Sequence, residues 1–176
     1  DRIYASNPCS EYMFLNDSAC NLASLNLLTY LDTEGNFEVD KFRHTVEVFI
    51  TAMEIIVDFA SYPTASIAKN SHEYRPLGLG YANLGTLLMM KGIPYDSEEG
   101  RAWAGALTAI LHNRAYARSA EIAKHKGTFE GFEKNKIPMM NVIQKHRDAS
   151  YSINPEKVPE YLIKSAREDG DRMLEL

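Results

Sequence analysis

The amino-acid sequence predicts a mostly helical α/β fold with two or three strands. Several long segments repeat apolar residues at steps of three and four, which is typical of helices that bury one face. Two short apolar segments, the second marked by glycines, favour strands. With 176 residues, 45% hydrophobic and 24% charged, the chain has the composition of a globular protein. We expect residues 1–176 to form one segment without an internal domain boundary.

The first 31 residues are rich in Asn, Ser and Leu and show little helical periodicity. Pro8 disfavours helical backbone at Asn7, so we expect an extended start and a loop there. A buried strand is predicted over Leu22–Leu31. A helix is then predicted from about Asp40 to Ser61, because its apolar residues share one face and Pro63 follows.

The remaining sequence predicts one more strand and four more helices. A capping pattern, Asp96 with Glu99 three residues later, indicates the start of the longest helix. Gly127 marks the end of that helix. The other predicted elements are a strand over 75–80, a helix over about 81–90, a short helix near 139–146, and a last helix opening around Pro159.

Charge and hydropathy exclude several classes of partner. The net charge of −5 argues against nucleic acid and anionic membranes, which reward a basic face. No segment approaches the ~20 apolar residues of a membrane span, and the first residues lack a signal peptide's apolar core. We therefore expect a cytoplasmic protein. The histidine spacing predicts no metal site. Because the chain opens with Asp1, we expect it to be part of a longer polypeptide.

Asn7, Cys9 and Glu11 bring an amide, a thiol and a carboxylate together at every second position. In an extended segment these side chains point to one side. A carboxylate neighbour disfavours a thiolate, so Cys9 suits chemistry of the neutral S–H, such as hydrogen-atom transfer. Glu11 is then free to act as a general base. The competing interpretation is a turn in which Asn7 caps the backbone, Cys9 is buried and Glu11 is solvated.

Cys20 is the only other cysteine. Its distance from Cys9 along the chain suits neither a Cys-x-x-Cys motif nor a zinc site. In a reducing compartment a structural bridge is also disfavoured. A small buried hydrophobic side chain is the simplest interpretation of Cys20 taken alone.

Three runs together resemble the large catalytic chain of ribonucleotide reductases, and among its branches most closely the adenosylcobalamin-dependent (class II) one. The resemblance covers essentially all 176 residues, and iron- or manganese-dependent branches are the alternative. Its first two runs are specific, whereas the third alone would be weak. The runs are residues 7–15 (Asn-Pro-Cys-Ser-Glu-Tyr-Met-Phe-Leu), 19–27 (Ala-Cys-Asn-Leu-Ala-Ser-Leu-Asn-Leu) and 75–80 (Arg-Pro-Leu-Gly-Leu-Gly).

The resemblance implies a role for each site residue. Cys9 would lie at the tip of a loop inside a ten-stranded α/β barrel, become a thiyl radical and abstract the 3′-hydrogen of a ribonucleotide. Glu11 would take the 3′-hydroxyl proton. Asn7 would bond the substrate hydroxyls and help hold that carboxylate. Cys20 would be one of two cysteines that reduce the 2′ position and end as a disulfide.

The resemblance also implies the reaction and its partners. The reaction is reduction of ribonucleotides, with diphosphates expected, to deoxyribonucleotides for DNA synthesis, and the cofactor is adenosylcobalamin. The partners are a thioredoxin-like or glutaredoxin-like reductant, the rest of the same polypeptide and a second copy in a homodimer. The effector region, the phosphate-binding loop and the cysteine partner of Cys20 are absent from these residues, so the segment alone should be inactive.

Two other functions remain open at this point. Cys9 could be the nucleophile of a thiol-dependent hydrolase or transferase. The chain could instead be a helical interaction module in which Cys9 and Cys20 only pack.

Overall fold

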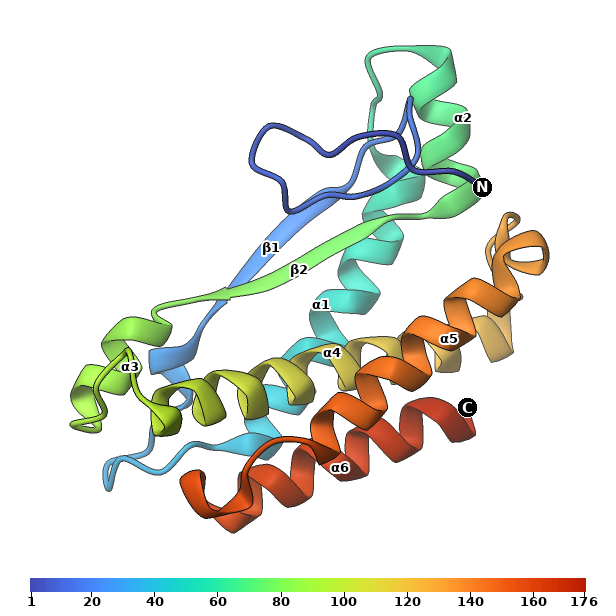
Figure 1. Ribbon diagram of the computed structural model, residues 1–176. Helices are drawn as coiled ribbons and strands as arrows, with labels where there is room; N and C mark the ends of the chain where they lie inside the picture. The colour runs from blue at the N-terminus through green and yellow to red at the C-terminus, as the bar shows by residue number, and fades with distance from the viewer.

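The computed structural model describes all 176 residues and has a mostly helical α/β fold (Figure 1). Two parallel strands form its only sheet, with Asn21 opposite Leu77 and Asn26 opposite Ala82. The strands are β1 (Asn21–Asn26) and β2 (Leu77–Ala82); the α-helices are α1 (Val39–Phe59), α2 (Ala65–Tyr74), α3 (Leu84–Met90), α4 (Glu98–Lys126), α5 (Phe132–Tyr151) and α6 (Glu160–Glu175).

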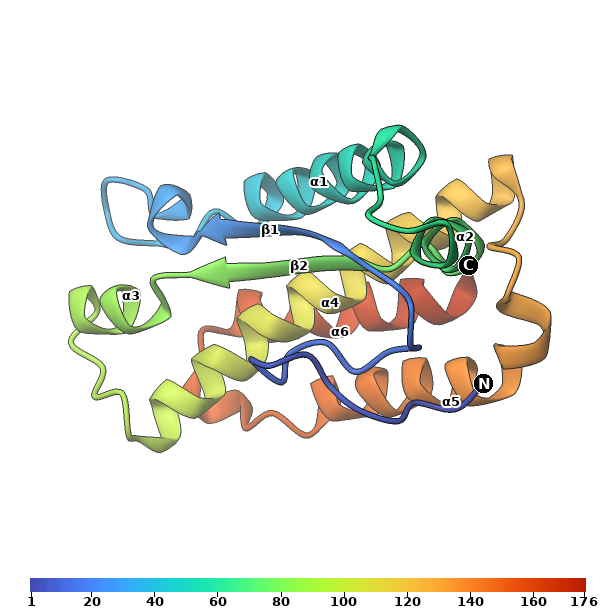
Figure 2. The same cartoon turned by 90° about the horizontal axis from the view of Figure 1, so that it is seen from above.

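The crossover between the two strands explains the position of α1 and α2. Parallel strands cannot be joined by a tight turn, so the chain must return to the starting end of the sheet before it pairs again. Here α1 and α2 make this return (Figure 2). Because α2 ends shortly before β2 begins, it lies at the end of the sheet where β1 also begins.

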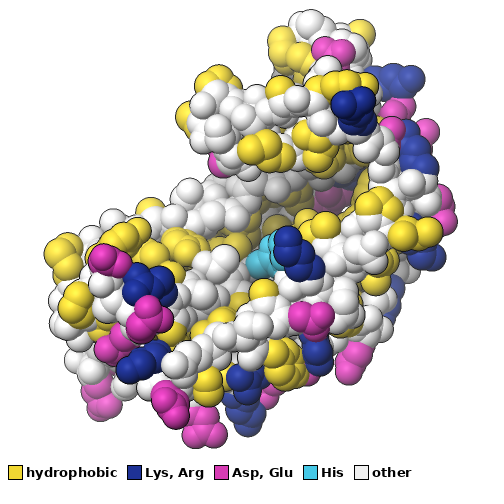
Figure 3. Space-filling view, viewed as in Figure 1, with side chains coloured by type: hydrophobic (Ala, Val, Ile, Leu, Met, Phe, Trp, Pro, Cys, Tyr) yellow, Lys and Arg dark blue, Asp and Glu magenta, His cyan; other side chains and the backbone are white.

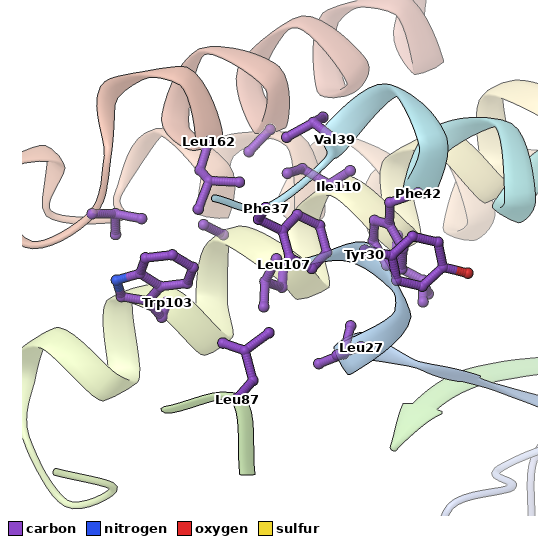
Figure 4. Packing of buried hydrophobic residues seen from close by; sticks show 14 of the residues in the cluster. Leu27, Tyr30, Phe37, Val39, Phe42, Leu87, Trp103, Leu107, Ile110 and Leu162 are labelled. Carbon is purple, nitrogen blue, oxygen red and sulfur yellow. The ribbon is translucent and has the colours of Figure 1, made fainter. Parts of the chain in front are cut away.

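One hydrophobic core joins the sheet end, α1, α4 and α6. Helix α1 buries Phe42, Val46 and Ile50, which recur at steps of four residues. Figure 4 shows Trp103 and Leu107 of α4 among these apolar side chains. Each such side chain contributes roughly 1.5–3 kcal/mol when it is removed from water. None of the helices combines the length and the apolar character needed to cross a bilayer.

The first strand is shorter than predicted. It ends at Asn26, and Leu27–Tyr30 form a 3-10 helix instead of continuing to Leu31. The Asn26 side chain accepts a hydrogen bond from the backbone N–H of Leu28 at 3.1 Å. Such a local bond gives the backbone an alternative to strand pairing, which explains the early end.

Three helix predictions also need correction. Helix α2 was not predicted, although Thr64 caps it by accepting a bond from the N–H of Ile67. Helix α5 is much longer than the predicted 139–146, because it runs through the exposed Pro138, where freed carbonyls can reach water. Helix α4 is capped by Ser97 rather than Asp96.

A buried carboxylate ties three helices together. Asp169 of α6 is 2% exposed and bonds Arg43 of α1 at 2.8 Å. Its other oxygen lies 3.4 Å from Arg114 of α4. Arg43 also donates to the backbone oxygen of Ser165 at 3.0 Å. Because the charges are partly desolvated, each depends on the others for compensation.

We expect Asp169→Ala to lower the free energy of unfolding by about 3 kcal/mol, because two arginines would lose their buried partner. Denaturant unfolding followed by the fluorescence of Trp103, the single tryptophan, measures this. The matched control is Asp40→Ala, whose side chain also pairs with Arg43 but is 99% exposed. That change should cost less than about 0.5 kcal/mol. Equal costs would contradict the role of Asp169.

Candidate active site

The segment around Cys9 is a closed loop at the sheet end that α2 covers (Figure 1). Ser6 and Met13 form an antiparallel bridge at its base. Within the loop, the N–H of Ser10 bonds the backbone oxygen of Asn7 at 3.0 Å, and Ser10 has a φ of 65°. The extended geometry predicted here is therefore wrong, because Pro8 starts a turn rather than a strand.

This turn brings Asn7 and Glu11 into direct contact. The Asn7 amide nitrogen donates to a Glu11 carboxylate oxygen at 2.5 Å, and the Asn7 side-chain oxygen accepts from the N–H of Tyr12 at 3.0 Å. Asn7 thus orients the carboxylate and caps the backbone at the same time. Its capping role was part of the competing interpretation, and the structure combines it with the predicted amide–carboxylate pair.

Cys9 lies between these two residues at an exposed position, as a free cysteine. The burial of Cys9 expected from the competing interpretation is therefore not found. A sulfur at an exposed loop position is accessible to a substrate or a cofactor that approaches from outside the chain.

Cys20 is half-buried and directly precedes β1. Burial raises the pKa of the Cys20 thiol, and the negative charge of Glu11 raises it further. Burial also raises the pKa of Tyr12, its hydrogen bond to Ser18 at 3.0 Å opposes this shift, and the charge of Cys20 adds to it. The charge of Glu11 therefore acts on the Cys20 thiol as well as within the loop.

A cavity in the chain lies away from this loop. It has a volume of about 620 Å³ and is lined by α1, α4 and Arg75, with no residue from the first 50. The molecular surface is also hollowed between the upper part, with the N-terminal loop and α2, and the helices below (Figure 3). Nowhere do three His, Cys, Asp or Glu side chains converge as metal ligands.

The profile of the family described as "Ribonucleotide reductase, barrel domain" matches residues 1–172. The chain belongs to this family. A vitamin B12-dependent ribonucleotide reductase of Rhodopirellula baltica is 53% identical over 99% of this chain and 17% of its own length. One of Bradyrhizobium diazoefficiens is 49% identical over 95% of this chain and 14% of its own length.

One more distant relative carries a more specific name. A vitamin B12-dependent ribonucleoside-diphosphate reductase of Mycobacterium tuberculosis is 34% identical over 74% of this chain and 19% of its own length. The chain thus spans about a sixth of the length of these reductases. The predicted membership of the ribonucleotide reductase family is confirmed.

Several residues next to Cys20 were not predicted from the sequence. Ser71 of α2 bonds the backbone of Ala19, and Gly78 of β2 lies against the Cys20 sulfur. Gly78 belongs to the run 75–80 that carries part of the family resemblance, but nothing in that run assigns it to Cys20, and Ser71 belongs to no such run. They could be found only once the crossover had placed α2 and β2 beside the start of β1.

We expect Glu11→Gln to speed alkylation of Cys20 several-fold at pH 8, measured by mass spectrometry in a Cys9→Ser background. The negative charge of Glu11 raises the pKa of Cys20, so its removal lowers that pKa and leaves more reactive thiolate. Glu34→Gln, an exposed charge in a distant turn, is the matched control and should have no effect. An unchanged rate in Glu11→Gln would mean that Glu11 does not act on Cys20.

Proposed function

We propose that this chain carries the radical cysteine, the general base and one reducing cysteine of a ribonucleotide reductase. The reaction converts ribonucleotides, with diphosphates as the expected substrates, to 2′-deoxyribonucleotides for DNA synthesis. The observation that carries the proposal is the Asn7–Glu11 hydrogen bond beside the exposed Cys9, in a chain of the reductase family. The names of the relatives support a dependence on vitamin B12.

The proposed first step needs a Cys9 sulfur from which a hydrogen atom has been removed. This thiyl radical takes the 3′-hydrogen atom of the ribose, so that an S–H bond forms and a radical remains at C3′. Glu11 accepts the 3′-hydroxyl proton, which helps the 2′-hydroxyl to leave. Asn7 keeps the carboxylate oriented through its amide and offers hydrogen bonds to the sugar.

The proposed second half consumes two thiols. Cys20 and a partner cysteine outside this chain give up two protons and two electrons and end as a disulfide. One proton leaves with the 2′-hydroxyl as water, and the other proton with both electrons becomes the new 2′ C–H bond. Glu11 returns its proton to the 3′ oxygen, and Cys9 returns the hydrogen atom to C3′ and regains its radical.

Adenosylcobalamin is the group that we propose to act on Cys9. When bound, this cofactor supplies the radical chemistry that removes the hydrogen atom from the Cys9 sulfur. The exposed sulfur is accessible to such a group. Cys9 lines neither the cavity beside Arg75 nor the one beside Tyr151, and we assign the holding of the cofactor to residues outside this chain.

The proposal also includes the barrel to which residues 1–176 belong and the protein partners of the full polypeptide. We place residues 1–176 as one undivided segment in the ten-stranded barrel of a longer polypeptide, with β1 and β2 as neighbouring barrel strands. The unpaired outer edges of this two-stranded sheet support further strand pairing. A thioredoxin-like or glutaredoxin-like protein would reduce the disulfide again, and the full protein would form a homodimer.

We expect Cys9→Ser to abolish nucleotide reduction in the full-length protein, assayed with adenosylcobalamin and a dithiol. Glu11→Gln should lower turnover by about 10²–10⁴-fold, because the base that takes the 3′-hydroxyl proton is lost. Glu34→Gln is the matched control and should retain turnover. Full nucleotide reduction by Cys9→Ser would contradict the proposal, and rapid alkylation of Cys9 at neutral pH would then favour a thiol-dependent hydrolase or transferase.

The isolated 176-residue chain should show no nucleotide reduction under the same conditions. Its two cysteines are Cys9, which has the radical role, and Cys20, so Cys20 has no second reducing cysteine to pair with. The measurement is deoxyribonucleotide formation compared with the Cys9→Ser form of the same chain. Turnover above that background would contradict the proposed need for a second reducing cysteine outside the segment.

A further inference from the structure

Helix α2 holds the backbone of the segment that leads into Cys20. Ser71 is completely buried, and its hydroxyl accepts a hydrogen bond from the N–H of Ala19 at 3.1 Å. The same hydroxyl donates to the backbone oxygen of Ala19 at 3.4 Å. One residue earlier on α2, the Asn70 amide donates to the backbone oxygen of Asn16 at 3.0 Å.

This use of a serine within a helix is unusual in the molecule. A hydroxyl inside a helix commonly bonds the carbonyl four residues earlier. Thr45 and Thr51 of α1 do this, each at 2.8 Å. The Ser71 hydroxyl instead both accepts from and donates to the backbone of Ala19, which is 52 positions away and directly precedes Cys20.

A second anchor follows directly after Cys20. The side chain of Asn21 donates to the backbone oxygen of Met53 on α1 at 3.1 Å. The Cys20 backbone is therefore held from both sides by two different helices. On β2, a Cβ added to Gly78 would lie 2.3 Å from the Leu22 side chain and 3.7 Å from the Cys20 sulfur. The sulfur thus lies against bare backbone.

We propose that Ser71 is a positioning residue for Cys20: its buried hydroxyl fixes Ala19 and so holds the Cys20 sulfur where it can reduce the substrate. This inference rests on the proposed function. A disulfide forms only when two cysteine Cα atoms lie about 4.4–6.8 Å apart, so a reducing cysteine needs a fixed backbone. Groups that support a reacting side chain must hold it within about 0.5 Å.

The test separates hydrogen abstraction by Cys9 from reduction by Cys20. In the full-length protein, one turnover without external reductant is followed with a 3′-tritiated ribonucleotide. The measured quantity is the amount of deoxyribonucleotide formed for each 3′ C–H bond that is cleaved. Ser71→Ala removes both hydrogen bonds to Ala19 and should lower this ratio by about fivefold or more, because about fivefold corresponds to one net hydrogen bond. Cleavage of the 3′ C–H bond should continue.

Ser150→Ala is the matched control. Ser150 of α5 is also buried, at 1% exposure, but its hydroxyl bonds the Arg147 carbonyl of its own helix. Ser150→Ala removes one buried hydroxyl, as Ser71→Ala does, and should leave the ratio at the wild-type value. Ser71→Thr, which keeps a hydroxyl, should restore most of the ratio. A wild-type ratio in Ser71→Ala would overturn the proposal.

Two further measurements keep the two proposals apart. If Cys9→Ser still cleaves the 3′-hydrogen, the proposed function fails, and Ser71 is then judged by iodoacetamide alkylation of Cys20 in the Cys9→Ser background. Ser71→Ala should speed that alkylation, and an unchanged rate overturns the positioning role of Ser71.

If Ser71→Ala does not fold, hydrogen exchange of the wild-type Ala19 amide decides. Protection like that of the β1 amides supports the bond to Ser71, and rapid exchange overturns it.

Discussion

The parallel pairing of β1 with β2 is the constraint on which the arrangement of the site depends. Parallel strands start at the same end of a sheet, so the chain must travel back along α1 and α2 before it can form β2. This return places α2 beside the start of β1, where the loop of Cys9 and the thiol of Cys20 also lie. The junction is fixed by Arg75, which adopts a left-handed backbone conformation and pairs with Glu54 and Asp58 of α1.

The two sulfurs occupy different environments that suit different chemistry. Cys9 is exposed on a turn, beside an amide–carboxylate pair that is held by local hydrogen bonds. Cys20 is half-buried, its backbone is anchored on two helices, and its pKa is raised by burial and by Glu11. An accessible sulfur suits the proposed exchange of a hydrogen atom with a substrate. A fixed, uncharged thiol suits the proposed role of a reductant. Glu11 connects the two because its charge reaches both parts of the site.

The fold was predictable where the periodicity of the sequence was strong. The predicted helix of 40–61 agrees with α1 to within two residues, since its apolar residues share one face that packs into the core. The misses have local causes. The predicted helix of 139–146 was too short because α5 continues through the exposed Pro138, and α2 was missed because its sequence is weakly apolar, although it contacts the N-terminal segment through Ser71. Asn26 ended β1 early through a bond to its own neighbouring backbone.

The sequence by itself determined which polar side chains meet in the loop, because Asn7, Cys9 and Glu11 lie within five residues and the Asn7–Glu11 contact needs only one turn of backbone. It also determined the long amphipathic helices. Only the tertiary structure decided that Cys9 is exposed, that Ser71 holds Ala19 and that Asp169 joins Arg43 across 126 residues. Such contacts follow from the crossover and from helix packing, and no local pattern of residue types encodes which distant backbone a buried hydroxyl or carboxylate will meet.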